Sequence, residues 1–181
     1  MGRPCRRSTG CERPPVNGGV VRPFAAGDAA AVLALILSIQ RGEFGLAVTA
    51  DDQPDLADVP GFYQTGAGQF WVAEREGAVV GTIGLRDIGA QANGRPAVAL
   101  RKMFVGPEAR GALGVAGPLL ATAIGHARAR DVAEIYLGTT DRFLAAHRFY
   151  EKHGFARIAP EALPPAFPRM AVDSVFYRLT L

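Results

Sequence analysis

A short run of small residues is the part of this sequence best suited to binding a ligand. Residues 110–117 read Arg-Gly-Ala-Leu-Gly-Val-Ala-Gly and join a predicted strand to a predicted helix. The first N–H groups of a helix have no carbonyl partner within it, so they can donate to an anion. Small side chains let that anion approach the backbone, and Arg110 adds positive charge. The run therefore predicts a site for a phosphate-bearing, nucleotide-like group.

Two other interpretations of this run stay open. In the simpler one, the glycines at 111, 114 and 117 only make a tight turn between strand and helix. The other is a dinucleotide-binding loop, which needs the pattern G-x-G-x-x-G directly after the first strand. The glycine spacing differs here, predicted antiparallel strands precede the run, and only residues 118–181 follow it. The dinucleotide-binding interpretation is therefore a poor match.

Hydrophobic periodicity and turn residues predict the elements that position the run. Helices are expected from Asp28 to residue 40, from Val115 or Ala116 to about residue 130, and from residue 142 to 153, with Asp28 and Asp141 as N-caps. Strands are expected at residues 20–24, 69–75, 79–86, 97–105, 134–138, 155–158 and 174–181. The order predicts a mixed α+β fold that begins as an antiparallel sheet and continues as a βαβα unit.

Between the first helix and the second strand, residues 41–68 carry several breakers, among them Pro54 and Val59-Pro60-Gly61. This segment is expected to be an irregular loop. Long loops inside compact domains are more often functional than idle, so it is a candidate substrate loop.

Composition and charge limit the classes of protein to consider. With 181 residues, 49% apolar and 20% charged, the chain fits one globular domain. Residues 1–19 hold four of the 20 basic and one of the 17 acidic side chains, so the rest carries equal numbers of both. We expect a disordered basic tail at residues 1–19 and a single domain at residues 20–181. A neutral domain disfavours a nucleic-acid partner.

The remaining composition argues against metal and membrane roles. Cys5 and Cys11 have no nearby third ligand, and His126, His147 and His153 lack metal-ligand spacing. No run approaches the roughly 20 apolar residues that span a bilayer, and the N-terminal stretch lacks the apolar core of a signal peptide. These features predict a cytoplasmic protein without a metal.

Two motifs give the chain a resemblance to the GNAT superfamily of N-acetyltransferases, over about residues 20–181. The first is the strand 99–105 followed by the run at 107–116, which is similar to the family's phosphate motif Q/R-x-x-G-x-G/A. Gly114 and Ala116 fit its last two positions, and Arg110 sits one residue early, as if the loop carried an extra residue. The second is residues 146–155, Ala-His-Arg-Phe-Tyr-Glu-Lys-His-Gly-Phe, which looks like the family's A-x-x-x-Y-E-K-x-G-F.

The resemblance implies a GNAT fold, a mostly antiparallel twisted sheet of about six to seven strands with about four helices. It also implies transfer of an acetyl group from acetyl-CoA to a primary amine of a small molecule or peptide. The cofactor-binding residues that it implies are Met103, Phe104, Val105, Arg110, Gly111, Ala112, Leu113, Gly114, Val115, Ala116, Phe143 and Tyr150. Amides of residues 103–105 would polarise the thioester, those of the run would bind the diphosphate, and Phe143 replaces an asparagine common in the family.

Tyr150 is the residue that the resemblance assigns to catalysis, as the general acid that protonates the thiolate. The alternative is that it packs in the core with Phe149 and Phe155. Arg101 is a candidate for holding a substrate carboxylate, with an outward-facing surface arginine as the alternative. Glu43 is a candidate substrate residue, with a solvated loop charge as the alternative. No base is evident, so a water chain is the candidate for deprotonating the amine.

A second class of function also stays open, a noncatalytic acetyl-CoA sensor or interaction domain, against which Tyr150 argues. Family habit further allows a homodimer.

Overall fold

The computed structural model describes residues 19–111 and 114–181 of the chain; the expected tail, including Cys5 and Cys11, and residues Ala112 and Leu113 lie outside the described residues. Seven strands form one sheet in the order β1-β2-β3-β4-β5-β7-β6. The strands are β1 (Gly19–Pro23), β2 (Gln69–Arg75), β3 (Ala78–Ala90), β4 (Pro96–Val105), β5 (Glu134–Thr139), β6 (Ala156–Ile158) and β7 (Val175–Thr180). All neighbours are antiparallel except β4 and β5, which are parallel. The predicted mixed α+β fold is confirmed.

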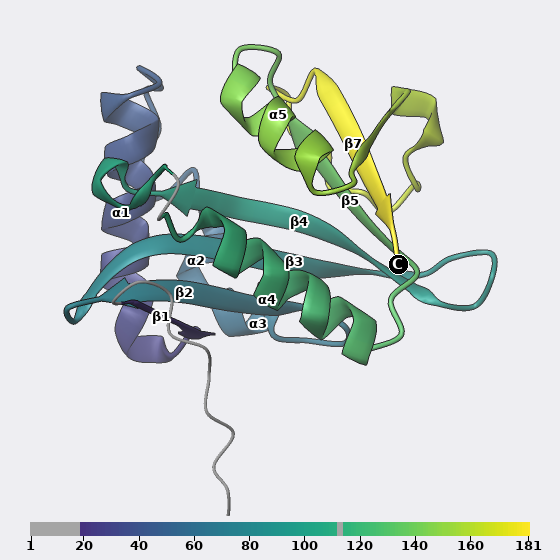
Figure 1. The fold of residues 1–181 in the computed structure, drawn as a ribbon, viewed down its shortest axis with the longest axis horizontal. Coiled ribbons are helices and arrows are strands. Elements are labelled where there is room, and N and C mark those ends of the chain that lie inside the picture. The colour runs from purple at the N-terminus through teal and green to yellow at the C-terminus, as the bar shows by residue number, and fades with distance from the viewer. Residues whose placement is uncertain (1–18, 112–113) are drawn as a thin grey trace, which may run out of the picture.

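The described residues form five α-helices, and Figure 1 shows how they lie against the sheet. They are α1 (Ala29–Gly42), α2 (Pro54–Ala57), α3 (Val59–Tyr63), α4 (Ala116–Ala129) and α5 (Leu144–Lys152). Alternate residues of β2 point to opposite faces, as a strand requires. Trp71 packs in the core cluster that contains α4 residues, and Phe70 packs in the cluster that contains α1 and α3 residues. The helices α1 to α3 and the helix α4 therefore cover opposite faces.

Strands β4 and β5 separate soon after they begin. They pair only over three positions, from Ala97 with Glu134 to Ala99 with Tyr136. Figure 1 shows the two strands diverging from this common end, β4 toward α1 and β5 with β7 and α5. The edge of β4 from Leu100 to Val105 consequently has no strand partner on its β5 side.

A β-bulge interrupts β4 in the same stretch. Lys102 and Met103 together lie opposite the single β3 residue Ile83, and Lys102 has a φ of 52°. An extra residue shifts the alternation of side chains by one position. Leu100 and Met103 accordingly pack in the α4-side core, whereas Arg101 and Lys102, adjacent in sequence, both line one pocket on the other face.

The predicted N-cap Asp28 is confirmed by position but not by a side-chain bond, and the predicted N-cap Asp141 is wrong, since Phe143 holds that position. Helix α1 begins at Ala29, but the carboxylate of Asp28 makes no cap bond to it; it accepts from the Ala25 N–H at 2.8 Å and pairs with Arg22 at 2.7 Å. A bidentate guanidinium is a stronger partner than a helix amide. Helix α5 begins at Leu144 without a side-chain cap. The backbone N–H of Asp141 instead donates to the Ser174 hydroxyl, which holds the residues before α5 in a loop.

The expectation that residues 41–68 are wholly irregular is also wrong. Pro54 and Pro60 stand in the first turns of α2 and α3, where proline's fixed φ and missing N–H suit a helix start. Asp58 caps α3 by accepting from the Gly61 N–H at 3.0 Å. The prolines predicted to interrupt regular structure therefore begin two short helices.

Candidate functional site

The loop between β4 and α4 is a tight turn whose own carbonyls take some of its amides. The N–H of Gly114 donates to the Gly111 carbonyl and the N–H of Val115 to the Ala109 carbonyl, each at 3.0 Å. Gly111 has a φ of 87°, and a Cβ on Gly114 would stand 2.6 Å from the Ala109 oxygen. The turn itself thus requires Gly114, as the simpler interpretation of the run proposed.

The start of α4 adds a second feature to this loop. The helix begins at Ala116, and no described residue offers a carbonyl to the N–H of Ala116 or Gly117. These groups carry the positive end of the helix dipole, where phosphates bind. A second carrier of charge lies at the other end of the loop, in Arg110.

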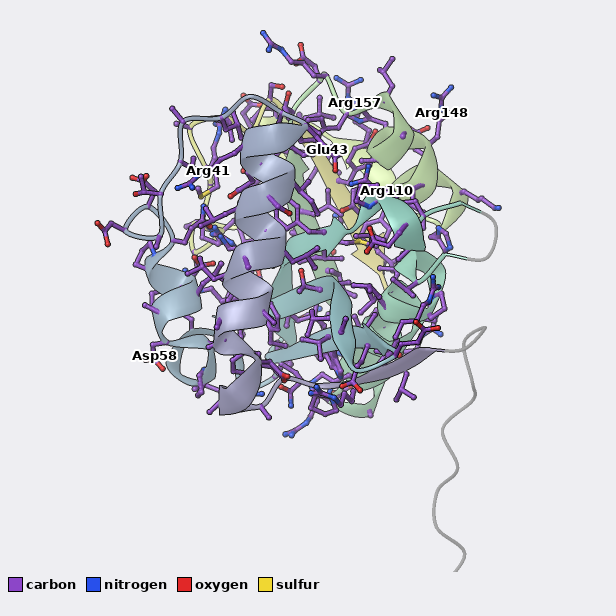
Figure 2. The ribbon with its side chains drawn as sticks, turned by 90° about the vertical axis from the view of Figure 1, so that its left-hand side faces the viewer. Arg41, Glu43, Asp58, Arg110, Arg148 and Arg157 are labelled. Carbon is purple, nitrogen blue, oxygen red and sulfur yellow. The ribbon has the colours of Figure 1, made fainter. Side chains whose placement is uncertain are left out.

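Arg110 is bonded to the residue that ends α1. Both of its terminal nitrogens lie 2.7 Å from the carboxylate of Glu43, and its Nε donates to the Val105 carbonyl at 2.8 Å. Figure 2 shows the two side chains meeting across the gap between α1 and β4. The guanidinium holds the pKa of Glu43 below its usual value. The structure therefore joins a candidate cofactor residue to a candidate substrate residue.

A second contact ties the same end of α1 to the other diverging strand. The ring of Phe44 lies against Phe143, with centroids 4.2 Å apart. Phe143 follows β5 and is the N-cap of α5, and Arg110 follows β4. Residues 43 and 44 therefore contact both sides of the β4–β5 divergence.

Tyr150 fits both interpretations that the sequence left open. Its ring packs against Phe149, Phe155 and Tyr177, and the residue is buried. Its hydroxyl nevertheless points at the bulge of β4, with the sulfur of Met103 3.6 Å away. Burial raises the pKa of Tyr150 above its ordinary value of 10.0, so the phenol keeps its proton and can donate it.

A pocket of about 240 Å³ lies on the α1–α3 face, next to the bulge. Four parts of the chain contribute side chains to it: the α1–α3 region, β3, β4 and the loop before β7. The lining residues are Asp52, Pro54, Asp55, Phe62, Tyr63, Arg86, Arg101, Lys102 and Met170.

Two guanidinium groups, those of Arg86 and Arg101, also line this pocket. Arg86 stacks over Phe62, with its Cζ 5.5 Å from the ring centre. Arg101 contacts the Pro168 carbonyl at 3.4 Å and the Met170 sulfur at 3.2 Å. Neither makes an ion pair within the described part of the chain. Arg101 thus lines the pocket, as predicted for a residue that holds a carboxylate.

Sequence reasoning missed a buried charged group on the same wall. The ammonium of Lys102 lies 3.2 Å from Asp55 and donates to Gln53, and its side chain is only 8% exposed. The other Asp55 oxygen accepts from the Tyr63 hydroxyl at 2.5 Å. Burial lowers the pKa of Lys102, and Asp55 opposes that shift. Its partner Asp55 is distant in sequence, so the one local signal was a lysine within an apolar strand.

These features fit a coenzyme A thioester. The unpaired edge of β4 offers amides, the start of α4 offers donors for a diphosphate, and the Tyr150 hydroxyl lies where the two strands part. In the described residues no cluster of three or more His, Cys, Asp or Glu side chains is arranged to hold a metal, and none of the described helices is long and apolar enough to cross a membrane.

Comparison with known proteins gives consistent matches. A model of the Acetyltransferase (GNAT) family matches residues 33–155. N-acetylaspartate synthetase of Danio rerio is 31% identical over 128 residues, which is 69% of this chain and 44% of that relative. This chain therefore spans less than half the length of that curated relative.

Solved structures match over nearly the whole fold. A GNAT-family acetyltransferase from Staphylococcus aureus Mu50 superposes with a TM-score of 0.81 at 35% identity, covering 90% of this chain and 98% of that one. N-acetylglutamate synthase from Neisseria gonorrhoeae, complexed with coenzyme A and N-acetyl-glutamate, has a TM-score of 0.66 at 19% identity, covering 90% of this chain and 35% of that one. The latter likeness concerns the fold alone.

Proposed function

Because the chain belongs to the GNAT acetyltransferase family, we propose that it transfers the acetyl group of acetyl-CoA to the primary amine of a small molecule bearing a carboxylate. The observation that supports this acceptor class is the pair of guanidinium groups, Arg86 and Arg101, lining one pocket beside the bulge of β4. The pocket volume of about 240 Å³ suits a small molecule better than the tail of a protein substrate.

In the proposed reaction the amine nitrogen bonds to the thioester carbonyl carbon, and the carbon–sulfur bond then breaks. Amides of β4 near Met103 stabilise the oxyanion, since fixed donors aimed at developing charge are usually the largest single contribution in acyl transfer. Tyr150 gives its proton to the leaving thiolate and is reprotonated by solvent, which also takes the remaining proton from the nitrogen as the amide forms.

The ammonium proton of the acceptor goes to water in this proposal. Asp52 is bonded to Thr49 through its backbone N–H and hydroxyl, each at 2.8 Å, and Asp55 is bonded to Lys102 and Tyr63. Both pocket carboxylates are therefore already bonded within the protein, and neither is assigned as the base.

Two guanidinium groups suit an acceptor with two carboxylates. The name of the Danio rerio relative, N-acetylaspartate synthetase, supports aspartate as the first acceptor to test. The second guanidinium would then distinguish aspartate from asparagine or alanine, which keep only one carboxylate.

The experiment measures thiol release from acetyl-CoA with aspartate, asparagine, alanine and alanine amide as acceptors. We expect Arg101→Ala to raise the apparent KM for carboxylate-bearing amines by roughly 10- to 100-fold, the loss of a hydrogen bond to a charged group, and to leave alanine amide unaffected. Arg95→Ala is the matched control, because Arg95 pairs with Asp131 at the surface.

Equal loss on every acceptor would contradict the carboxylate role. Binding of acetyl-CoA without thiol release on any amine would instead favour the noncatalytic sensor.

A further inference from the structure

Lys102 combines a strained backbone with a buried, fully bonded side chain. Three described residues other than glycine have positive φ values, and Lys102 is the one of them that lies within a strand. Glu76 and Asp131 lie in turns instead. A side chain in the left-handed region persists only where its surroundings hold it, and such residues concentrate at functional sites.

Contacts hold this bulge from both neighbours. On the β3 side, the hydroxyl of Thr82 donates to the Lys102 carbonyl at 2.7 Å, and Thr82 is fully buried. On the α2 side, the Lys102 ammonium is bonded to Asp55 and Gln53. Asp55 is itself fixed by the Tyr63 hydroxyl. The backbone at Lys102 is thus fastened to an adjacent strand and to the wall of the acceptor pocket.

Met103, the residue after Lys102, is the one whose position matters for acyl transfer. Met103 lies on the opposite face from Lys102, beside the Tyr150 hydroxyl, on the part of β4 that β5 has left. Its amide lies on the stretch of β4 from Leu100 to Val105, which has no strand partner on the β5 side. A shift at Lys102 would therefore move a donor relative to the Tyr150 proton.

We propose that Lys102 is a positioning residue for acetyl transfer: its buried bonds to Asp55 and Gln53 hold the left-handed bulge that orients the Met103 amide. The proposal rests on the proposed function, in which that amide stabilises the oxyanion. Although Lys102 lines the acceptor pocket, its ammonium is already bonded to Asp55 and Gln53. Lys102 acts through the backbone.

The first test replaces Lys102 with glycine, which adopts positive φ freely but has no side chain to anchor. Hydrogen–deuterium exchange of the β4 amides reports the positioning directly, whether or not any amine is acetylated. We expect Lys102→Gly to speed exchange at residues 103–104 at least roughly tenfold, because the local opening becomes easier. Unchanged exchange would overturn the proposal even if the wild-type protein were inactive on every amine tested.

The second test separates positioning from stability. Lys102→Met leaves Asp55 buried without its cation and should lower Tm, and the double variant Lys102→Met/Asp55→Asn, which has neither charge, should recover Tm. We expect kcat to stay at least roughly tenfold down in the double variant with KM for acetyl-CoA unchanged, as for a lost transition-state contact. Recovery of kcat together with Tm would overturn the proposal, as would a change confined to the acceptor KM.

Two further variants keep the result interpretable. Val132→Ala removes buried apolar volume between α4 and β5, so it should lower Tm without changing kcat of the folded protein. If the double variant does not fold, Asp55→Asn alone decides, since its amide oxygen still accepts from Tyr63. A fall in kcat at constant acetyl-CoA KM supports the proposal, and an unaltered kcat overturns it.

Discussion

The proposed donor side of the site, residues 103–117 with Phe143 and Tyr150, differs in construction from the proposed acceptor side, the pocket around Arg86 and Arg101. Most of the donor side is one continuous segment, and the groups proposed to bind acetyl-CoA are mainly backbone amides at a strand edge and a helix start. The acceptor side takes side chains from four separate parts of the chain. Backbone groups depend on local conformation, so a motif can encode them, whereas the pocket exists only after folding.

The largest effect is expected from the one side chain on which the donor side depends. Tyr150→Phe should lower kcat by roughly 10²- to 10⁴-fold, the usual contribution of a positioned proton donor. Because burial raises the pKa of Tyr150 above 10.0, its acid form persists, and wild-type kcat should show no alkaline loss from this group below pH 10.0. Thiol release measured across pH checks both expectations.

The control for that variant is Tyr136→Phe. It removes the hydroxyl that donates to Glu134 at 2.6 Å, on the side of the sheet that carries Ile158 and Phe167. Equal losses of kcat in the two variants would assign Tyr150 to packing alone.

An intermediate effect tests whether the donor side depends on backbone shape. Gly114→Ala places a Cβ 2.6 Å from the Ala109 oxygen, so the turn before α4 must shift. We expect the Kd for acetyl-CoA to rise about tenfold or more, equivalent to about 1.4 kcal/mol, by calorimetric titration. Gly125→Ala is the matched control, because nothing lies within 4 Å of its new Cβ. In a helix it should raise stability by roughly 0.5–1 kcal/mol and leave the Kd unchanged.

The smallest effect concerns the contact between the donor side and the C-terminal end of α1. Glu43→Gln removes the carboxylate that occupies both terminal nitrogens of Arg110. The freed guanidinium should strengthen acetyl-CoA binding by roughly two- to fivefold at low salt, an effect that added salt screens. Asp51→Asn removes the same charge from the same loop and should leave the Kd unaltered. Weaker binding in Glu43→Gln would show that the ion pair helps to shape the site.

The sequence predicted the fold class, the strand before and the helix after the run at residues 110–117, and the family, because these depend on local patterns. It also placed Tyr150 and Arg101 in regions that the structure brings to the site. It missed Arg86, Lys102 and Asp55, since nothing local marks residues that meet only across α2, β3 and β4. The bond between Glu43 and Arg110 was likewise invisible, although both residues were named. The expected tail, homodimer and cytoplasmic location stay predictions.

The bulge in β4 has a practical consequence for comparing this protein with its relatives. Side chains before and after Lys102 follow opposite phases of the strand's alternation, so the register on one side does not carry over to the other. In a sequence alignment, a gap placed one position away from the bulge would match core positions of one protein with pocket positions of the other. Specificity inferred for Arg101 from another member therefore holds only where that member's extra residue falls at the same place.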